Sequence, residues 1–549
     1  MRLIYFFLSL CIVAWSQPAK IGWLGAVSAI FGFAFFFHSL SSSFSKWQRF
    51  FAGTIWFASI EFIQLSWMTS IEFHGFYILL VYFLVALGLG CQFGLLTIFI
   101  PAHGKMISKK ILFCASLWTF MEWLRLCISC GFSWNPIGLS LTHFIVSLQF
   151  SSLFGVLGLS FWVMLTNLVS LNALRSTVSI KYISSWVMII AAPYLFGLCQ
   201  LNYYQREQRS EKSIVDIALV QTDLLPSEKN PHRDRMDDFI APLEQWKRII
   251  ISLKEKQVFC WDMIVLPEAA VPLSSNVCNY SYDQTRKLLV TTLGPEVEKK
   301  FPPLCFPYAE QKEFINQKVL CVSNLFWCQT LANFYDAEII VGLDHYDRKE
   351  NKNFNSIFYL TPNHFLFERY DKQILLPLAE YLPFDFLQTL TKKYGICEFF
   401  SHGQEAKVFG KKIPFSPSIC YEETFSEMMR IGRLKGAKLF VNATNDNYYP
   451  DSSLHAQHFF HARLRAVENG IPLIRACNSG VTAIVDCFGR FLAKFESEDK
   501  ERKHDGVLNY HLTCFHFSTL FSFWGDAGII GLCLIFILYP LRMKNKFFN

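Results

Sequence analysis

The chain has 549 residues, of which 52% are hydrophobic and 17% charged, and its net charge is +7. This composition excludes an ordinary water-soluble protein. The charges are uneven, since residues 50–100 contain no Lys or Arg while residues 205–256 are rich in both signs. We therefore predict a membrane-embedded part and a water-soluble part. The basic residues cluster beside apolar segments, where they set membrane topology, so we expect no nucleic-acid partner.

Eight apolar segments approach the length of about 20 residues that a membrane-spanning helix needs. Seven of them form a predicted membrane domain over residues 1–200. The eighth lies in a C-terminal region, 516–549, which ends in a basic cytoplasmic tail. The first segment is short enough to be a signal peptide instead. The approximate ranges are 3–16, 19–38, 50–69, 76–100, 109–130, 150–173, 181–200 and 518–541.

The basic residues that flank these segments predict the orientation of the chain. With a cytoplasmic N-terminus, the loops on the opposite side hold Lys20 alone. This asymmetry follows the positive-inside rule and puts residues 201–515 outside the cytoplasm, whether or not the first segment is cleaved. The cytoplasmic side then holds Lys46, Arg49, Lys105, Lys109, Lys110, Arg175, Lys181, Arg542, Lys544 and Lys546.

Two charged residues, Glu122 and Arg125, lie inside the fifth segment, where an unpaired charge is costly. Their i, i+3 spacing allows an ion pair on one helix face, and contact with a lipid headgroup is the alternative. The loop that follows, residues 130–138, is rich in Gly, Pro and aromatic residues. It could shape an entrance for lipid or belong to an interfacial aromatic belt.

The predicted water-soluble domain, residues 201–515, contains both strands and helices. Helices interleave with strands early in the domain and strand pairs follow later, which favours an α/β domain of two stacked sheets with outer helices. Helices are expected near 234–256, 425–433 and 453–470. Apolar runs predict strands near 213–222, 262–267, 338–344, 354–360, 364–370, 405–409, 415–420, 437–442, 471–477 and 480–486.

The connection at residues 271–335 is longer than a simple link between two elements needs. It contains Cys278, Cys305, Cys321 and Cys328. In an oxidising compartment some of these could form disulfides, although the sequence does not give the pairing. The spacing of these cysteines and the absence of clustered histidines argue against zinc, so we expect no metal.

Three short stretches together form one candidate active site. Cys420 follows a predicted strand and precedes a helical run, a position where the helix dipole favours the thiolate. Glu268 follows a buried run that ends at Pro267, and Lys372 precedes an apolar run interrupted by two prolines. Acyl transfer through a thioester needs these three groups, because it uses a base, an oxyanion partner and a nucleophile.

These stretches resemble the Glu-Lys-Cys motifs of the nitrilase superfamily and, more closely, those of the apolipoprotein N-acyltransferase family. The resemblance covers nearly the whole chain and implies an α-β-β-α sandwich for the water-soluble domain, next to a multi-span α-helical membrane domain. It is carried by Pro267-Glu268, residues 372–383, residues 419–422, residues 122–125, Asn445-Asp446, residues 458–466 and residues 475–482.

The resemblance also implies supporting residues around the triad. Glu380 and Glu422 would support the site, since a carboxylate near Lys372 keeps that lysine charged and oriented, and Tyr421 is a further supporting candidate. Asn355 matches a family position beside the site, although an ordinary turn asparagine is the alternative.

Two further stretches bear on substrate access. Residues 381–390 could cover an acyl chain or form a core helix, and residues 447–453 could be a mobile rim or a plain turn. The chain departs from the family in lacking a Trp in residues 220–230, which puts substrate positioning there in doubt.

The resemblance implies N-acylation of lipoproteins in two half-reactions. Cys420, activated by Glu268, takes an acyl chain from a membrane phospholipid. The α-amino group of a lipoprotein's N-terminal diacylglyceryl-cysteine then attacks the thioester, and Lys372 stabilises both oxyanions. We expect a monomer without cofactor in the bacterial inner membrane, with the catalytic domain on the periplasmic side. A membrane-tethered amidase or nitrilase that uses water, and a non-catalytic membrane scaffold, are the alternatives.

Overall fold

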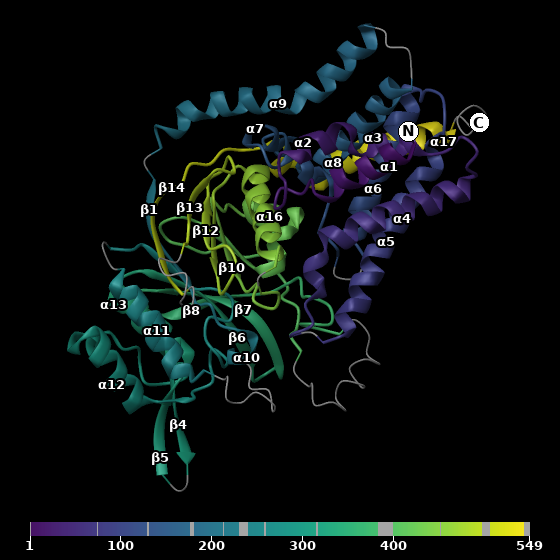
Figure 1. Ribbon diagram of the computed structural model, residues 1–549. Coiled ribbons are helices and arrows are strands. Elements are labelled where there is room, and N and C mark those ends of the chain that lie inside the picture. The colour runs from purple at the N-terminus through teal and green to yellow at the C-terminus, as the bar shows by residue number, and fades with distance from the viewer. Residues whose placement is uncertain are drawn as a thin grey trace.

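The protein consists of a helical bundle and a domain of two stacked sheets (Figure 1). The first and last helices of the chain both lie in the bundle, so the sheet domain is inserted between membrane-type helices. The computed structural model describes residues 2–73, 75–128, 131–175, 180–211, 213–229, 240–256, 260–314, 317–382, 399–450, 452–496 and 505–542.

Each apolar segment predicted from the sequence contains a helix. Within the described residues, four helices are long and apolar enough to cross a membrane, namely Tyr77–Phe99, Ser151–Leu174, Tyr182–Gln208 and Leu520–Tyr539. The other predicted spans hold shorter or more polar helices, so the seven-span domain stays a prediction. The bundle contains α1 (Arg2–Ala14), α2 (Leu24–Val27), α3 (Phe33–Ser39), α4 (Lys46–Gln64), α5 (Tyr77–Phe99), α6 (Ser108–Leu126), α7 (Ile145–Leu148), α8 (Ser151–Leu174), α9 (Ile180–Gln208) and α17 (Leu520–Arg542).

A buried asparagine satisfies the backbone where the second apolar segment departs from α-helical geometry. Residues Ser28–Gly32 form a π-helical turn between α2 and α3. The Asn167 side chain on α8 accepts hydrogen bonds from the backbone N–H groups of Phe33 and Ala34, both at 3.0 Å. It also donates to the carbonyl oxygens of Ser28 and Ala29. Because an unpaired backbone group in lipid is costly, one polar side chain makes this irregular turn possible inside an apolar bundle.

Two sheets form the centre of the second domain. The first has the strand order β14-β1-β2-β6-β7-β8 and the second has the order β13-β12-β11-β10-β9. Strands β1, β2 and β6 are parallel neighbours and are apolar, as expected of strands covered on both faces. The strands are β1 (Ile214–Gln221), β2 (Met263–Val265), β6 (Glu338–Asp347), β7 (Lys352–Thr361), β8 (His364–Asp371), β9 (Phe415–Ile419), β10 (Leu439–Thr444), β11 (Leu473–Cys477), β12 (Ala483–Val485), β13 (Phe491–Lys494) and β14 (Gly506–Thr513).

The predicted α-β-β-α sandwich is confirmed. Apolar side chains from the facing surfaces of both sheets form one core cluster. Helices α11 (Pro242–Glu255) and α13 (Asn324–Tyr335) cover the outside of the first sheet. Helices α15 (Ser426–Leu434) and α16 (Leu454–Asn469) cover the outside of the second. The second pair of helices also faces the bundle (Figure 1).

Two of the predicted elements differ in the structure. The strand expected at 405–409 is wrong, because only Phe409 makes a bridge, to Phe415, across a tight turn at Gly410. The helix expected near 234–256 is described from Pro242, where a proline at the first helical turn loses no hydrogen bond. The earlier residues of that prediction, 234–239, lie outside the described part of the chain.

The long connection at 271–335 forms a compact unit beside the first sheet. It contains α12 (Tyr282–Leu293), α13 and a small sheet of β3 (Tyr280–Ser281), β5 (Gln317–Val322) and β4 (Ala309–Phe314). The β4–β5 hairpin projects from the domain at the lower edge of Figure 1. The four cysteines of this region are free thiols in the structure.

The two domains share one hydrophobic core. Five side chains of the sheet domain belong to the same buried cluster as the apolar side chains of the bundle helices. This contact fixes the position of α15 and α16 against the helical bundle. The five side chains are Tyr421, Phe425, Leu454, Leu464 and Val467.

Candidate active site

Three predicted site residues come from neighbouring strands of the first sheet. Glu268 follows β2, Asn355 lies in β7 and Lys372 follows β8. The Glu268 carboxylate accepts hydrogen bonds from Asn355 Nδ2 at 2.7 Å and from Lys372 Nζ at 3.3 Å. Gly342 in β6 allows this approach, because a Cβ atom there would lie 2.6 Å from Glu268 Cα. The structure thus brings together three residues that are far apart in the sequence.

Glu380 is the second carboxylate that contacts Lys372. Its Oε1 lies 2.8 Å from Lys372 Nζ and accepts a second hydrogen bond from Asn355 Nδ2 at 3.0 Å. Burial alone would lower the pKa of Lys372, but the Glu268 and Glu380 carboxylates outweigh burial and hold this pKa well above its usual value. Lys372 is therefore a permanent ammonium group whose side chain is only 1% exposed. An ammonium has three donors, so one remains for a further acceptor when only the described residues are counted.

Cys420 comes from the second sheet, at the end of β9. It is the first residue of the 3₁₀ turn Cys420–Thr424 and has a φ of 51°, a left-handed conformation that is rare for a residue with a side chain. The backbone there is held by its carbonyl oxygen, which accepts hydrogen bonds from His458 Nε2 at 3.2 Å and from Asn442 Nδ2 at 3.4 Å. Such strained positions cluster at functional sites.

The Cys420 thiol lies close enough to Glu268 and Lys372 to interact with their charges. Burial raises the pKa of Cys420 well above its usual value, the Glu268 charge raises it further and the Lys372 charge lowers it. The helix dipole expected to favour the thiolate acts against burial and the nearby carboxylates, so the thiolate stays a prediction. The thiol must give its proton to a base before it can act as a nucleophile.

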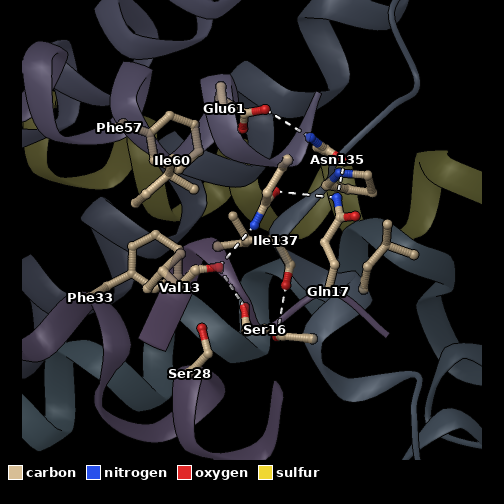
Figure 2. Close-up of a pocket in the computed structure, with 14 residues that line it drawn as sticks. Val13, Ser16, Gln17, Ser28, Phe33, Phe57, Ile60, Glu61, Asn135 and Ile137 are labelled. Carbon is tan, nitrogen blue, oxygen red and sulfur yellow. Dashed lines mark hydrogen bonds between the residues drawn. The ribbon is translucent and has the colours of Figure 1, made fainter. Parts of the chain in front are cut away.

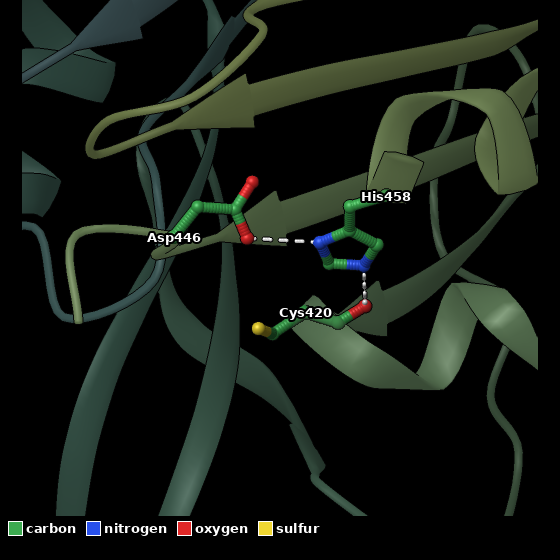
Figure 3. Close-up of side chains that lie close together, drawn as sticks. All are labelled: Cys420, Asp446 and His458. Carbon is green, nitrogen blue, oxygen red and sulfur yellow. Dashed lines mark hydrogen bonds and ion pairs between the residues drawn. The ribbon is translucent and has the colours of Figure 1, made fainter. Parts of the chain in front are cut away.

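A histidine and an aspartate that were not predicted as site residues lie beside Cys420 (Figure 3). Sulfur, imidazole and carboxylate ligand atoms of Cys420, Asp446 and His458 all lie within 4.8 Å of one another. Figure 3 shows the Cys420 sulfur pointing away from the imidazole ring, which instead faces the Cys420 carbonyl oxygen. Because a carbonyl oxygen only accepts, Nε2 carries a proton, and Nδ1 lies 2.8 Å from Asp446 Oδ1. Both ring nitrogens are thus committed to protein groups, which favours a backbone-holding role over metal binding.

Arg475 binds the acidic groups around this histidine. Its guanidinium group lies 2.8 Å from Glu423 Oε1 and 3.1 Å from Asp446 Oδ2. The neighbouring His458 and Arg475 side chains hold the pKa of Asp446 well below its usual value despite its burial. The network supports the Cys420 turn through the contact of His458 with the Cys420 carbonyl oxygen. The motifs at 458–466 and 475–482 were noted in the sequence, but their contacts with the nucleophile's backbone were not predictable.

The other two predicted supporting residues, Glu422 and Tyr421, make different contacts. Glu422 does not contact Lys372 directly but accepts hydrogen bonds from the Tyr370 hydroxyl at 2.9 Å and from the Gln373 N–H at 2.6 Å. It also accepts from the Ile419 N–H at 2.8 Å, so it ties the end of β9 to the chain after β8. The Tyr421 hydroxyl contacts the loop after α6, since it accepts a hydrogen bond from the Ser133 N–H at 3.3 Å and donates to the Gly131 carbonyl oxygen at 3.2 Å.

The loop after the fifth apolar segment binds the sheet domain. Glu122 accepts a hydrogen bond from the Ile137 N–H at 2.9 Å, and Arg125 donates to the Trp134 carbonyl oxygen at 3.0 Å. The direct ion pair that their spacing allowed is absent from the described residues, since each side chain binds the loop instead. Trp134 Nε1 in turn donates to Gln457 Oε1 at 2.8 Å. The loop is therefore a connector between α6 and α16.

A small cavity lined by both polar and apolar side chains holds Asn135 of this loop inside the bundle (Figure 2). The cavity has a volume of about 30 Å³. Glu61 accepts a hydrogen bond from Asn135 Nδ2 at 2.8 Å, and Gln17 donates to Asn135 Oδ1. Asn135 has a left-handed φ of 53°, and these contacts fix it. The cavity anchors the connector and contains none of the predicted site residues.

The two predicted lids lie partly outside the described residues. Residues 383–390 of the first stretch and residue 451 of the second are not described. In the second stretch, the buried Asn447 donates to the Leu224 carbonyl oxygen at 2.8 Å. Both lids remain predictions.

Comparisons with known proteins match both domains of the chain. The family model for carbon-nitrogen hydrolases matches residues 217–502, and the model for the apolipoprotein N-acyltransferase N-terminal domain matches residues 9–169. An apolipoprotein N-acyltransferase of Chlamydia pneumoniae is 30% identical and covers 98% of this chain and 97% of its own length. That of Chlamydia caviae is 28% identical, with 98% and 96% covered.

A solved structure is also similar to the sheet domain. It is a Saccharomyces cerevisiae member of branch 10 of the nitrilase superfamily, 18% identical with a TM-score of 0.35. The alignment covers 55% of this chain and 91% of the yeast chain.

Proposed function

Because the chain belongs to the apolipoprotein N-acyltransferase family, we propose that it transfers an acyl chain from a membrane phospholipid to the N-terminal amine of a lipoprotein. The observation that carries this proposal is the meeting of Glu268, Lys372 and Cys420 at the ends of two sheets, next to apolar helices. Both substrates carry acyl chains, so an enzyme with membrane helices can meet them within the bilayer.

In the first half-reaction, the Glu268 carboxylate takes the proton of the Cys420 thiol. The thiolate attacks the ester carbonyl carbon of the phospholipid, and the oxyanion that forms is stabilised by the free donor of Lys372. The C–O bond then breaks, a thioester remains on Cys420, and the lysophospholipid alkoxide takes the proton back from Glu268. The raised pKa of the resting thiol agrees with the need for this base.

In the second half-reaction, the α-amino group of an N-terminal diacylglyceryl-cysteine attacks the thioester. Glu268 accepts a proton from the attacking amine, and Lys372 again faces the oxyanion. The C–S bond breaks, and the Cys420 thiolate recovers a proton from Glu268. Asn355 and Glu380 act as positioning residues, since they hold the acceptor oxygen of Glu268 and the ammonium group of Lys372.

The proposal includes a topology. Residues 1–200 form a membrane domain of seven spans in the bacterial inner membrane, and residues 201–515 face the periplasm. The C-terminal region 516–549 returns the basic tail to the cytoplasm, as its Lys and Arg residues favour. One chain supplies all three triad residues, so a monomer suffices. Protease added to intact spheroplasts should cleave in 201–515 and leave a tag on the C-terminus protected.

The test of the chemistry is intact-mass spectrometry of the purified protein after incubation with phosphatidylethanolamine. The wild type should gain one acyl group that hydroxylamine removes, and Cys420→Ala should gain none. Addition of a diacylglyceryl-cysteine peptide should then clear the adduct and acylate the peptide. A wild type without adduct, in folded protein with lipid present, would contradict the proposal.

A hydrolase that uses water is not favoured. The match of residues 9–169 is to the N-terminal domain of acyltransferases, which a tethered amidase would not need. The intact arrangement of Glu268, Lys372 and Cys420 likewise argues against a non-catalytic scaffold.

A further inference from the structure

Two membrane helices are broken in the same way a few residues after they begin. Gly155 in α8 has φ 64° and ψ −166°, and Gly525 in α17 has φ 59° and ψ −153°. Only glycine adopts this backbone conformation readily. The residues before the two breaks, Phe154 and Trp524, stack with ring centroids 4.8 Å apart. The breaks therefore lie side by side.

After each break, one backbone N–H group donates a hydrogen bond to a glutamate of the sheet domain. Glu468 Oε1 on α16 accepts from the Val156 N–H at 2.7 Å. Glu427 Oε1 on α15 accepts from the Asp526 N–H at 2.6 Å. A carboxylate at a helix start is favourable because it meets free N–H groups and the positive end of the helix dipole. The two contacts thus act as N-terminal caps supplied by another domain.

The carbonyl groups before the breaks also have partners. Arg430, one turn after Glu427, donates to the carbonyl oxygens of Ser522 at 3.1 Å and Phe523 at 2.7 Å. Trp524 Nε1 donates to the Leu153 carbonyl oxygen at 2.6 Å. The broken backbone is therefore satisfied on both sides, which is a requirement close to a membrane.

The two capping helices are the ones that hold the nucleophile. Helix α15 begins two residues after the Cys420–Thr424 turn, and α16 carries His458, which donates to the Cys420 carbonyl oxygen. Ser426 at the start of α15 also donates to Glu468 Oε1 at 3.4 Å, so the two caps are linked. A displacement of either cap would move the Cys420 backbone relative to the bundle.

We propose that Glu427 and Glu468 are positioning residues, which cap α8 and α17 and thereby fix the place of Cys420 relative to the membrane. This inference rests on the proposed function, because a fixed place matters only when the acyl donor is a lipid in the bilayer. A small water-soluble ester can reach the thiol from any direction that the domain leaves open. Comparing a lipid acyl donor with a water-soluble ester therefore separates a loss of positioning from a general loss of stability.

The experiment compares Glu427→Ala and Glu468→Ala with the wild type in the full-length protein. One donor is phosphatidylethanolamine in mixed micelles, and the other is p-nitrophenyl acetate. With the lipid, acylation of Cys420 should slow by about tenfold or more, whereas acylation by the soluble ester should stay within about twofold. Glu427→Gln and Glu468→Gln should recover most of the lipid rate, since the amide oxygen still accepts the backbone N–H.

Matched glycine variants in α17 provide an independent measurement. A Cβ atom at Gly525 would lie 2.0 Å from Glu427 Oε1, whereas one at Gly531 meets nothing within 4 Å. Gly525→Ala should therefore reproduce the lipid-specific loss of Glu427→Ala, and Gly531→Ala should behave as the wild type.

The outcomes separate the two proposals. Equal losses with both donors, or no loss with the lipid, would overturn the positioning role and leave the proposed function intact. A wild type that reacts with p-nitrophenyl acetate but never with phosphatidylethanolamine would overturn the proposed function and this inference with it. Because the buried Glu468→Ala change could prevent folding, Glu427→Ala, whose side chain is 40% exposed, is the decisive variant.

Discussion

Lys372 places one ammonium group between two carboxylates, those of the buried Glu268 and the partly buried Glu380. Its Nζ lies 3.3 Å from Glu268 Oε1 and 2.8 Å from Glu380 Oε1. Removing one partner of a buried ion pair leaves an uncompensated charge, which destabilises a protein by about 3–5 kcal/mol. The same side chain therefore serves both the folding of the site and its proposed chemistry.

We predict that Lys372→Met lowers the free energy of unfolding by about 3–5 kcal/mol and abolishes the acyl adduct. The double variant Lys372→Met with Glu380→Gln should regain part of the stability, because one buried charge is removed, but none of the activity. Thermal unfolding in detergent and intact mass measure the two effects. Adduct formation at the wild-type rate in Lys372→Met would exclude the lysine as the oxyanion partner.

His461 should make stability depend on pH. It is buried in α16 against the Trp134 ring, and burial, followed by the Arg465 charge, holds the pKa of His461 well below its usual value. Below about pH 6.5 the unfolded chain therefore binds a proton that the folded chain does not. The free energy of unfolding should fall as the pH drops through this value, by up to about 1.4 kcal/mol per pH unit for this group.

The control for this prediction is His461→Gln, which cannot be protonated. Melting temperatures of the wild type and the variant should be compared between about pH 7.5 and pH 5, the range around the ordinary histidine pKa. The wild type should lose more stability than the variant on acidification. Identical slopes would mean that His461 contributes nothing to the pH dependence.

At the scale of the elements, strand ends were predictable and lateral contacts were not. The apolar run before Glu268 contains β2, which ends at Val265, and Cys420 directly follows β9, which ends at Ile419. The contact between His458 and Cys420 joins residues 38 positions apart through the packing of α16, which no local pattern encodes.

Two other contacts also depend on packing that the local sequence does not encode. Arg475 and Glu423 are 52 residues apart and meet only because β11 lies two strands from β9. Glu122 and Arg125 have the spacing of an ion pair, but the loop backbone at Ile137 and Trp134 competes for them. Sequence reasoning could identify the chemistry-bearing side chains but not the interface that orients them.

Gln457 is the junction between the connector loop, α4 and α16. Its Oε1 accepts from the indole N–H groups of Trp67 at 3.0 Å and Trp134 at 2.8 Å, and its Nε2 donates to the Gln64 carbonyl oxygen at 2.9 Å. Gln457→Leu should lower the free energy of unfolding by about 2–3 kcal/mol, because it leaves buried polar groups without partners.

Thermal unfolding and the tryptophan emission spectrum measure this effect. Gln457→Glu keeps the acceptor for both indoles but replaces the donor to Gln64 with a buried carboxylate oxygen, so it should also be less stable than the wild type. A Gln457→Leu protein as stable as the wild type would show that the junction contributes no stability.

At the scale of the whole molecule, the sheet domain shares part of its core with the helical bundle. Its side chains Tyr421, Phe425, Leu454, Leu464 and Val467 are buried in a cluster with the membrane helices. A chain limited to residues 213–514 would expose this contiguous apolar patch to water, which promotes aggregation.

We therefore predict that a chain of residues 213–514 is recovered mainly as aggregate and that mild detergent increases its soluble fraction. Size-exclusion chromatography with and without detergent measures this outcome. The full-length protein in the same detergent is the control. A monodisperse, detergent-free fragment would contradict the shared core.

Glu427 accepts a hydrogen bond from the Asp526 N–H, which lies in the last helix that the structure describes, α17. During translation, N-terminal segments emerge and fold first, at about 5–20 residues per second. The Cys420 turn is therefore synthesised more than a hundred residues before one of its two membrane supports, by the numbering of the chain. A nascent or prematurely terminated chain would hold the thiol without its proposed alignment to lipid, so acyl transfer would begin only once the last helix has been inserted.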